Sequence, residues 1–450
     1  MVQGQAPGPP TSLSGELAGS LGRRLDQVDA DLARRYPGGD LRQPVHTLYL
    51  PAPAFAADAA SRLGDQALAA LAAHAPDPAA LAEILGLPGA LAGPVHRRVA
   101  AKLAAEPVED LRIDFEDGYG SHPDPEEDAA AVAAAAELAS GLAAATLPPR
   151  IGLRIKPFTG PARARGIRTL DVFLTALLDA SGGRLPGGFV VTFPKAMVPE
   201  QVTVLVEVLD ALEQALSLPA GVLRVELQVE TTQALLDQLG TVPLPQLVAA
   251  ARGRCTALHF GTYDYTAACG LPPSEQHLAH PACDFARHLM QVATAGTGVL
   301  LADGSSNLLP VGPPDAVRGA WRVHYGLVRR SLAHGFYQGW DLHPAQLVSR
   351  YAAVFAFFRE HLPEVTARLR AATGTGGRGA AGRAAAGTGS TGATGPVADE
   401  PATARMLAAW LARGLDCGAI DPDETGVARP LLAQLTAPPA GAPPAPPSPR

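Results

Sequence analysis

Short apolar segments that alternate with helical ones are the feature that most constrains how this chain can fold. Segments with the composition of buried strands recur eight times between residues 45 and 342. Runs of this kind, bounded by turn residues, are typical of strands buried in a sheet. Helical patterns separate most of them, which is typical of parallel βα units. The expected strands are 45–50, 111–113, 151–156, 188–193, 223–229, 256–260, 298–301 and 335–342.

Polar residues at the strand ends decide between two arrangements of such units. One is an open, doubly wound sheet, and the other is a closed (β/α)₈ barrel. Nearly every expected strand ends in ionisable groups, and a barrel gathers those ends on the face where such enzymes place their chemistry. We therefore predict an α/β fold, a (β/α)₈ TIM barrel with N-terminal helical additions and a C-terminal helix after a flexible linker. The groups are Asp114, Glu116, Asp117, Arg154, Lys156, Lys195, Glu230, Asp264, Asp303 and His343.

Changes in composition along the chain predict its domain boundaries. The two ends are polar or rich in proline, and a stretch rich in glycine, alanine, threonine and arginine reads as a linker. The predicted parts are a disordered lead at 1–13, a barrel at 14–370 with a helical insertion at 55–107, a low-complexity linker at 371–397, a helical segment at 398–436 and a disordered tail at 437–450.

Composition and charge also narrow the classes of function. The net charge of −7 argues against a nucleic acid or an anionic membrane surface as partner. The four cysteines are scattered without a Cys-x-x-Cys pair, and no apolar run is long enough to span a bilayer. The N-terminal residues lack the basic and apolar regions of an export signal. We therefore expect a cytoplasmic protein that binds neither nucleic acid nor membrane.

Two carboxylates at the ends of consecutive expected strands are the candidate metal ligands. Glu230 directly follows the strand at 223–229, and Asp264 follows the strand at 256–260. In a barrel the two side chains can converge on a single ion. Two carboxylates with water and a chelating substrate suit Mg²⁺ or Mn²⁺. The alternative is that they are two unrelated surface acids.

Three further side chains are candidates for chemistry. Arg154 lies in an apolar strand and can bind a substrate carboxylate or enolate bidentately; a structural ion pair with Asp114 or Glu116 is the alternative, and both can hold. Lys195 can bind substrate electrostatically or act as a Schiff-base amine. His343 can be an acid/base or a hydrogen-bonding rim residue, and a purely structural histidine is equally compatible with its pattern.

Taken in order, these motifs resemble the citrate lyase β-subunit-like branch of the HpcH/HpaI aldolase family, within the phosphoenolpyruvate/pyruvate barrel superfamily. The likeness runs from about His46 to Arg350. The residues that carry it are 48–52 (Leu-Tyr-Leu-Pro-Ala), 114–117 (Asp-Phe-Glu-Asp), 153–155 (Leu-Arg-Ile), 194–195 (Pro-Lys), 229–231 (Val-Glu-Thr), 260–264 (Phe-Gly-Thr-Tyr-Asp) and 343–346 (His-Pro-Ala-Gln).

The resemblance implies a reaction and a set of roles. Members of this family make or break a carbon–carbon bond next to a 2-oxo acid or an acyl thioester, through an enolate that Mg²⁺ stabilises. Here it implies that Glu230 and Asp264 bind the metal and that Arg154 contacts the substrate. We also expect Gly261 and Thr262 to bind substrate. The acidic residues Asp114, Glu116 and Asp117 would orient water at the metal and hold the arginine.

The sequence also departs from that family. The insertion at 55–107 is long, and the loop after the first strand lacks the basic residues that thioester-using relatives often have. The use of a CoA thioester is therefore open. The expected protein is a Mg²⁺-dependent lyase or aldolase acting on a small 2-oxo or 2-hydroxy acid, and a homo-oligomer. The alternatives are a malate synthase-like Claisen condensing enzyme on the same barrel, and a non-catalytic barrel scaffold.

Overall fold

The computed structural model describes residues 12–38, 42–373, 386–388, 394–396 and 401–436. The predicted tail at 437–450 lies outside these residues, as do most of the lead at 1–13 and most of the linker at 371–397. Two three-residue strands inside the linker range, β9 (Ala386–Thr388) and β10 (Thr394–Pro396), pair antiparallel.

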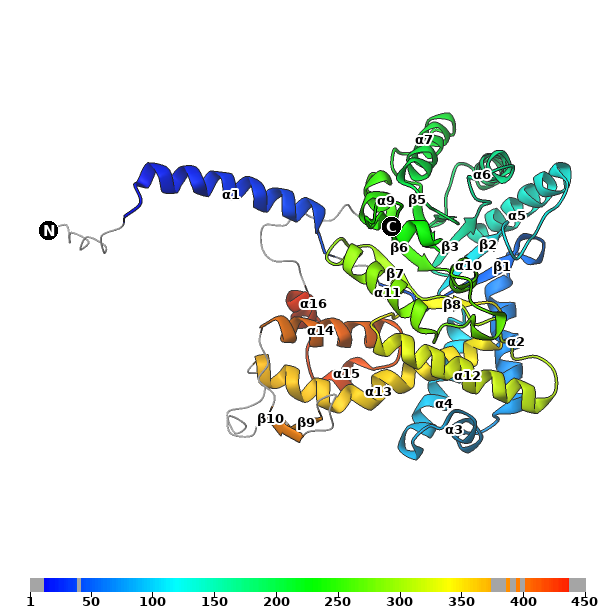
Figure 1. Ribbon diagram of the computed structural model, residues 1–450. Coiled ribbons are helices and arrows are strands. Elements are labelled where there is room, and N and C mark those ends of the chain that lie inside the picture. Colours follow the sequence, from blue (N-terminus) through cyan, green and yellow to red (C-terminus); the bar gives the residue numbers. More distant parts are fainter. Residues whose placement is uncertain (1–11, 39–41, 374–385, 389–393, 397–400, 437–450) are drawn as a thin grey trace.

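Eight parallel strands form the barrel at the centre of the molecule (Figure 1). They pair in the order β7-β6-β5-β4-β3-β2-β1-β8. A parallel bridge between Ala302 and Gln338 links the two ends of this series and closes the sheet. The predicted (β/α)₈ TIM barrel is therefore confirmed. The strands are β1 (His46–Pro51), β2 (Asp110–Asp114), β3 (Arg150–Arg154), β4 (Val190–Phe193), β5 (Arg224–Val229), β6 (Cys255–Phe260), β7 (Leu300–Ala302) and β8 (Gly339–Asp341).

Some strand boundaries differ from those expected, and glycines in the left-handed region explain two of the differences. Gly188 has a φ of 69° and Gly335 a φ of 83°, so each belongs to the turn before its strand and not to the strand itself. Strands β4 and β8 are shorter for this reason than the predicted 188–193 and 335–342. The predicted strand at 298–301 is found one or two residues later, as β7.

Helices surround the barrel, and those that follow the strands pack on its outer surface (Figure 1). They are α5 (Asp124–Ala144), α6 (Ala162–Ser181), α7 (Pro199–Ala215), α8 (Thr232–Leu235), α9 (Leu244–Ala250), α10 (Thr262–Ala268), α11 (Pro281–Thr294), α12 (Pro314–Ala333) and α13 (Gln346–Thr373). Aromatic residues make up only 5% of the chain, so small side chains do much of the packing. Helix α5, for example, buries Ala131, Ala134 and Ala135, which lets it lie close to α6.

Two groups of helices flank this ring. The predicted insertion at 55–107 contains α2 (Ala59–His74), α3 (Pro78–Leu85) and α4 (Gly89–Ala105). The C-terminal helices are α14 (Pro401–Asp416), α15 (Pro422–Thr425) and α16 (Arg429–Thr436), and α14 packs against α13 (Figure 1). Helix α14 ends before Gly418, which has a φ of 78°.

Helix α1 (Gly15–Arg35) differs from all of these because none of its residues is buried. It extends away from the barrel, to which its C-terminal end is attached (Figure 1). The backbone N–H of Gly38 donates to the carbonyl of Gly296 and fastens this end to the loop between α11 and β7.

Within the described residues, no single helix is long and apolar enough to cross a membrane. One pair of helices, α3 and α4, passes the same test of length and composition when taken together, but the two are bent by 110° at the break between them.

Candidate active site

A buried arginine with two carboxylate partners lies at the C-terminal ends of neighbouring strands β2 and β3. Arg154 donates from Nε to Oδ1 of Asp114 and from Nη2 to Oδ2, each over 2.6 Å. Its Nη1 lies 3.1 Å from Oε2 of Glu116. The expected proximity of these two acids to Arg154 is thus found. The Asp114 and Glu116 carboxylates hold the pKa of Arg154 above its usual value in spite of its burial.

Asp114 also shapes the turn that follows its own strand. Its Oδ1 accepts the backbone N–H of Glu116, and its Oδ2 accepts the N–H of Gly118, each over 2.9 Å. A Cβ at Gly118 would lie 2.5 Å from that Oδ2, so a side chain at this position would displace the carboxylate. One aspartate therefore fixes both the arginine and the acidic loop beside it.

Lys195 extends from the loop after β4 into the same cluster. Its Nζ lies 2.6 Å from Oε1 of Glu116, 3.3 Å from Oδ2 of Asp117 and 2.9 Å from Oδ2 of Asp264. Burial lowers the pKa of Lys195, but Glu230 and Glu116 raise it by more, so the ammonium form is favoured. A protonated lysine is a poor nucleophile, so this arrangement favours electrostatic binding over the amine role.

The backbone of Lys195 is itself unusual. Its φ is 52°, in the left-handed region that residues with a Cβ seldom occupy, at a cost of roughly 1 kcal/mol. In this conformation the Lys195 N–H donates to Oε1 of Glu230 over 2.8 Å. The same residue thereby contacts carboxylates through both its backbone and its side chain.

Glu230, at the end of β5, is the more deeply buried of the two candidate metal ligands, with 3% of its surface exposed. Burial raises the pKa of its carboxyl to about 7; Lys195 and Arg154 oppose this rise, whereas Glu116 and Asp264 add to it. The raised pKa means that the two nearby cations do not fully compensate the burial of Glu230 and the charge of its acidic neighbours.

Gly261 makes room for Glu230. A Cβ at position 261 would lie 2.4 Å from both Cβ and Oε2 of the glutamate, so only glycine allows this approach. Thr262, the next residue, is buried, and its Oγ1 has no hydrogen-bond partner in the described part of the chain. Asp264 lies in the first turn of α10, and 44% of its side chain is exposed. A substrate or water molecule can therefore bond to the Thr262 hydroxyl and to the Asp264 carboxylate.

The charges at these strand ends do not balance. Five carboxylates surround only two cationic side chains, Arg154 and Lys195. The carboxylates belong to Asp114, Glu116, Asp117, Glu230 and Asp264. Such an excess is stabilised when a further cation binds.

A divalent ion fits the donors, though in a limited way. No group of three or more His, Cys, Asp or Glu side chains that could hold a metal ion is found among the described residues. Mg²⁺ is commonly held by one or two carboxylates with water and substrate oxygens filling its other positions. Glu230 and Asp264 meet that smaller requirement, but Lys195 already contacts Asp264 and would have to share it with the ion.

The structure does not bring every predicted residue into this cluster. His343 is half-buried, and its Nδ1 accepts the backbone N–H of Ala345 at the start of α13. Burial lowers its pKa. Among the described contacts none joins His343 to the carboxylates.

Asp303 is paired with buried Arg287, and Lys156 binds Glu127 and the carbonyl of Phe115, so both have structural partners.

An aromatic pair beneath Arg154 was not anticipated from the sequence. The guanidinium carbon lies 4.7 Å from the ring centroid of Tyr49 in β1, and the Trp340 ring in β8 lies 4.7 Å from the Tyr49 ring. Cation–π contact of this kind stabilises a buried arginine. The Trp340 indole N–H is buried without a partner in the described residues. Aromatic residues in both runs were the available signal, but nothing in the sequence shows that the two rings meet beneath the same arginine.

A second network, also missed, fills the barrel interior below this layer. Arg112 of β2 donates to both carboxylate oxygens of Glu226, each over 2.8 Å, and also to Asp110. Thr192 and His259 contact the same glutamate. The Arg112 guanidinium holds the pKa of Glu226 well below its usual range in spite of burial. Arg112, Thr192 and Glu226 are hydrogen-bonded to one another, so we interpret this network as structural.

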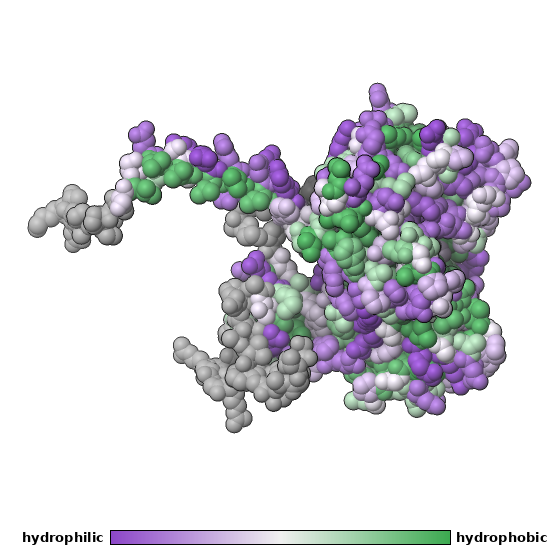
Figure 2. Space-filling view, in the orientation of Figure 1, coloured by the Kyte–Doolittle hydropathy of each residue, from purple (hydrophilic) through white to green (hydrophobic). Residues whose placement is uncertain are grey.

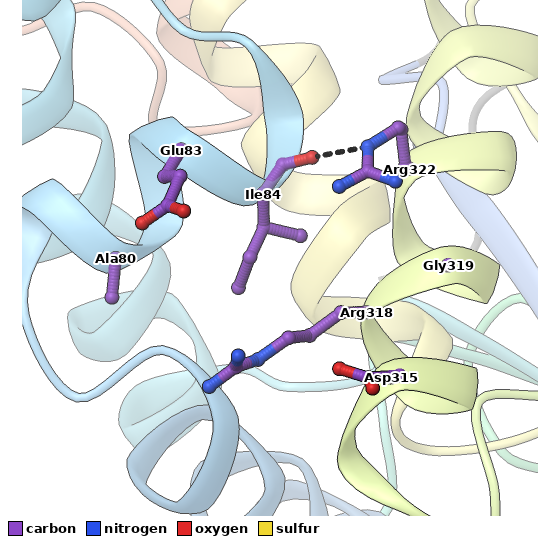
Figure 3. Close-up of a pocket in the computed structure, with 7 residues that line it drawn as sticks. All are labelled: Ala80, Glu83, Ile84, Asp315, Arg318, Gly319 and Arg322. Carbon is purple, nitrogen blue, oxygen red and sulfur yellow. Dashed lines mark hydrogen bonds between the residues drawn. The ribbon is translucent and has the colours of Figure 1, made fainter.

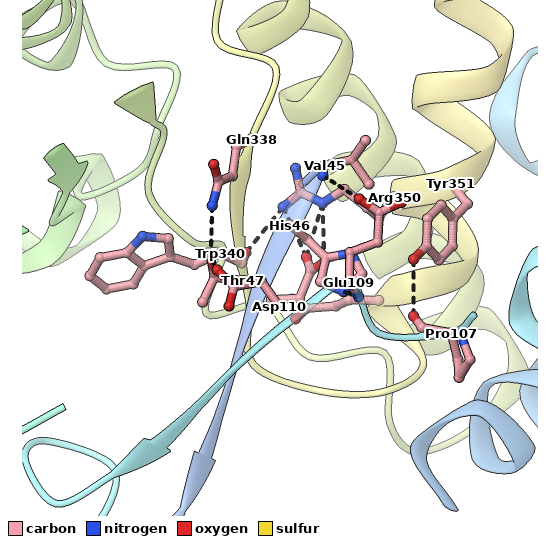
Figure 4. Close-up of polar contacts among 12 residues, drawn as sticks. Val45, His46, Thr47, Pro107, Glu109, Asp110, Gln338, Trp340, Arg350 and Tyr351 are labelled. Carbon is pink, nitrogen blue, oxygen red and sulfur yellow. Dashed lines mark hydrogen bonds and ion pairs between the residues drawn. The ribbon is translucent and has the colours of Figure 1, made fainter. Parts of the chain in front are cut away.

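The opposite, N-terminal face of the barrel has its own buried polar contacts (Figure 4). His46, at the start of β1, is fully buried, and burial lowers its pKa to about 3. Its Nε2 accepts the backbone N–H of Glu109, whose Oε2 accepts the N–H of Val45. In the same group Arg350 donates to Asp341. Such enzymes place their chemistry at the other end of the barrel, so we assign these contacts a structural role.

A cavity of about 360 Å³ lies elsewhere, between α3 and α12 (Figure 3). Its lining residues are Ala80, Glu83, Ile84, Asp315, Arg318, Gly319 and Arg322. Arg322 donates to the carbonyl of Ile84 and so joins the two helices. None of these residues belongs to the carboxylate cluster, so the cavity is a separate feature.

Fold and cluster together define the class of protein: a (β/α)₈ barrel with a charged, carboxylate-rich site at the C-terminal ends of its strands. Residues 25–438 match the family described as Domain of unknown function (DUF6986), and the chain belongs to that family. A search of curated proteins found no match.

The solved structures that resemble this chain include two named enzymes and one member of a named enzyme family. Malate synthase from Haloferax volcanii matches with a TM-score of 0.45 and 16% identity, over 74% of this chain and 85% of that one. The citrate lyase beta subunit from M. tuberculosis, complexed with oxaloacetate and magnesium, gives 0.38 and 18%, over 72% and 99%. An HpcH/HpaI aldolase/citrate lyase family protein from Burkholderia cenocepacia gives 0.38 and 15%, over 76% and 99%. No activity follows from likenesses this distant.

Proposed function

We propose that this protein is a Mg²⁺- or Mn²⁺-dependent carbon–carbon lyase or aldolase that acts on a small 2-oxo or 2-hydroxy acid. The observation that carries the proposal is the cluster in which buried Glu230 lies beside Lys195, Asp264 and the fixed guanidinium of Arg154. Cleavage of a bond next to a carbonyl leaves negative charge on oxygen, and groups that hold positive charge there lower the barrier. The motif resemblance to the HpcH/HpaI family supports the same choice.

In this proposal Glu230 and Asp264 hold the divalent ion. When bound, the ion would supply positive charge beside the oxygen on which enolate charge develops. The excess of carboxylates over cations supports this part of the proposal, as does the small volume of Gly261 against Glu230. Solvent and substrate oxygens would supply the remaining ligands.

Arg154 has the role of orienting the substrate acid. A guanidinium has five N–H donors; in Arg154 two of them bond to Asp114, and Nη1 lies 3.1 Å from Oε2 of Glu116. In the proposal the remaining donors bind a substrate carboxylate. Lys195 would add a second positive charge, and the unpartnered hydroxyl of Thr262 a hydrogen bond. His343, whose ring nitrogen bonds the N–H of Ala345, is proposed as an acid/base or a hydrogen-bonding rim residue.

Three further properties belong to the proposal. The first is that the protein is a distant relative of the HpcH/HpaI and citrate lyase-like enzymes. The second is a reducing, cytoplasmic setting, in keeping with four cysteines that are all free. The third is that the substrate acid is used either free or as its thioester.

The experiment is a turnover assay on a panel of 4-hydroxy-2-oxo acids, malate and their CoA thioesters. Release of pyruvate or glyoxylate is followed with Mg²⁺ and with EDTA. We expect release with Mg²⁺ and at least a hundredfold less with EDTA; equal rates in the two conditions would sink the proposal. A second arm supplies acetyl-CoA and glyoxylate, and a product formed only there would favour the condensing alternative.

A further inference from the structure

Helix α1 carries a stripe of exposed apolar side chains along one side. Figure 2 shows the stripe as a continuous green band on the extended helix. It consists of Leu17, Leu21, Leu25, Val28 and Leu32, whose exposed fractions are 47%, 40%, 61%, 50% and 47%. We call this stripe the α1 apolar face. Monomeric soluble proteins seldom leave such a continuous apolar patch in water.

Four of these five residues have the spacing of a coiled coil, and Leu17 lies one position beside that seam. Leu21, Leu25, Val28 and Leu32 follow one another at intervals of four, three and four residues. This alternation places all four on the narrow seam by which two helices pack side by side. A helix that packs on a globular surface usually shows a broader stripe. Helix α1 is also long enough, at 21 residues, for three heptads.

The charges on α1 argue against a membrane surface as its partner. Its arginines are Arg23, Arg24, Arg34 and Arg35, and its acids are Glu16, Asp26, Asp29 and Asp31, so the two signs balance. Helices that lie on anionic membranes carry an excess of basic residues on their polar side. A partner helix with the same mixed charges suits this balance better.

We propose that α1 pairs with α1 of a second copy of this chain in an antiparallel two-stranded coiled coil. The orientation follows from the attachment of α1, whose C-terminal end meets the barrel while the rest projects from it (Figure 1). A parallel pair would bring two barrels to the same end of the coil, where they would compete for space. An antiparallel pair sends them to opposite ends, about 30 Å apart along a helix of this length.

In the antiparallel orientation, apolar side chains face apolar ones and opposite charges face each other. With the centre of the coil between Asp26 and Gln27, Leu25 packs against Val28 of the partner subunit, and Leu21 against Leu32 of the partner subunit. Beside this seam Arg24 faces Asp31 of the partner subunit, and symmetry repeats the pair. Asp31 also bonds Arg34 of its own helix, and a carboxylate can accept from both.

The test is sedimentation velocity on the full chain between about 1 and 100 µM, with circular dichroism to check that the barrel is folded. We expect a dimer, or a larger assembly whose mass halves when the α1 face is changed. Leu25→Asp, at a position that is 61% exposed, should weaken association by at least about a hundredfold, since it places charges in the seam. Arg23→Glu, on the opposite side of the helix, is the control and should have little effect.

A charge exchange tests the orientation. Arg24→Glu alone should weaken the dimer by about fivefold, as each of two pairs turns repulsive. Adding Asp31→Arg should restore it, because the antiparallel pair is rebuilt. Rescue by Asp29→Arg in its place would indicate a parallel coil and would overturn the proposal. The proposal is also wrong if the wild type is a monomer, or if the assembly of the Leu25→Asp variant has the same mass as that of the wild type. Binding of α1 to vesicles with 30% anionic lipid would overturn it as well.

Discussion

Arg154 and Asp114 are joined by two parallel hydrogen bonds, Nε to Oδ1 and Nη2 to Oδ2, both 2.6 Å long, although they lie 40 residues apart in the chain. The two residues are opposite one another where β2 pairs with β3. Their pairing fixes the plane of the guanidinium at the mouth of the barrel. The position of the substrate acid in our proposal depends on this plane.

Loss of that pairing has a predicted cost in stability. Asp114→Asn keeps the volume but removes the charge that balances Arg154, and a broken buried ion pair costs about 3–5 kcal/mol. Urea unfolding should show a loss of this order, and turnover should fall because the guanidinium is no longer fixed. The matched control is Asp179→Asn, at an exposed position on α6. A loss below about 0.5 kcal/mol in Asp114→Asn would contradict the assigned role.

Removal of the lysine should separate metal affinity from turnover. The Lys195 ammonium contacts Asp264, one of the two proposed metal ligands, and so competes with a divalent ion. Lys195→Met should therefore bind Mn²⁺ several-fold more tightly. Turnover should still fall by about tenfold or more, since a positive charge near the substrate is lost. Weaker Mn²⁺ binding in this variant would mean that Lys195 supports the ion and does not oppose it.

The network inside the barrel should behave as a unit. Arg112→Met alone leaves Glu226 and Asp110 buried without their cation, and we expect a loss of about 3–5 kcal/mol in unfolding free energy. Combining Arg112→Met with Glu226→Leu removes both charges of the main pair. The double variant should lose less than the sum of the two single ones. Additive losses in urea unfolding would show that the two residues are not coupled.

Stability should depend on pH through His46. Its pKa is about 3 in the folded protein because of burial, against 6.5 for an ordinary histidine. The unfolded chain therefore binds the extra proton first, so the free energy of unfolding falls as pH drops from 6.5 toward 3. The slope from this one group reaches about 1.4 kcal/mol per pH unit.

A substitution isolates this contribution. His46→Gln keeps an acceptor for the N–H of Glu109 but does not titrate. Urea unfolding at pH 5.0, 5.5, 6.0 and 6.5 should give a flatter profile in the variant by about the slope of one proton. The same slope in both proteins would assign the pH dependence to other groups, such as His324, whose pKa is also lowered by burial.

Much of the fold follows from the sequence because strands of a parallel barrel are buried on both faces. Such strands read as continuous apolar runs, and the expected runs at 223–229 and 256–260 are β5 and β6 with boundaries one residue different. The polar groups at their ends are equally visible. They predict a shared face, and on that face Asp114, Glu116 and Lys195 do lie together.

Other features depend on contacts that no local pattern contains. Arg112 stands in an apolar run, and its partner Glu226 lies 114 residues further along the chain. Only closure of the barrel brings the two together. His343 is ambiguous for a different reason, since a histidine before proline serves equally well as a reactive group or as an acceptor at a helix start. Its bond to the N–H of Ala345 could not be read from its letters.

Titration calorimetry with Mn²⁺ tests the central claim most directly. The wild-type chain should bind one Mn²⁺, and Glu230→Gln and Asp264→Asn should each weaken that binding by at least about tenfold. Glu200→Gln, at an exposed position on α7, should bind like the wild type. If the wild type binds no divalent ion, or if Glu230→Gln binds it unchanged, the account of this site is wrong.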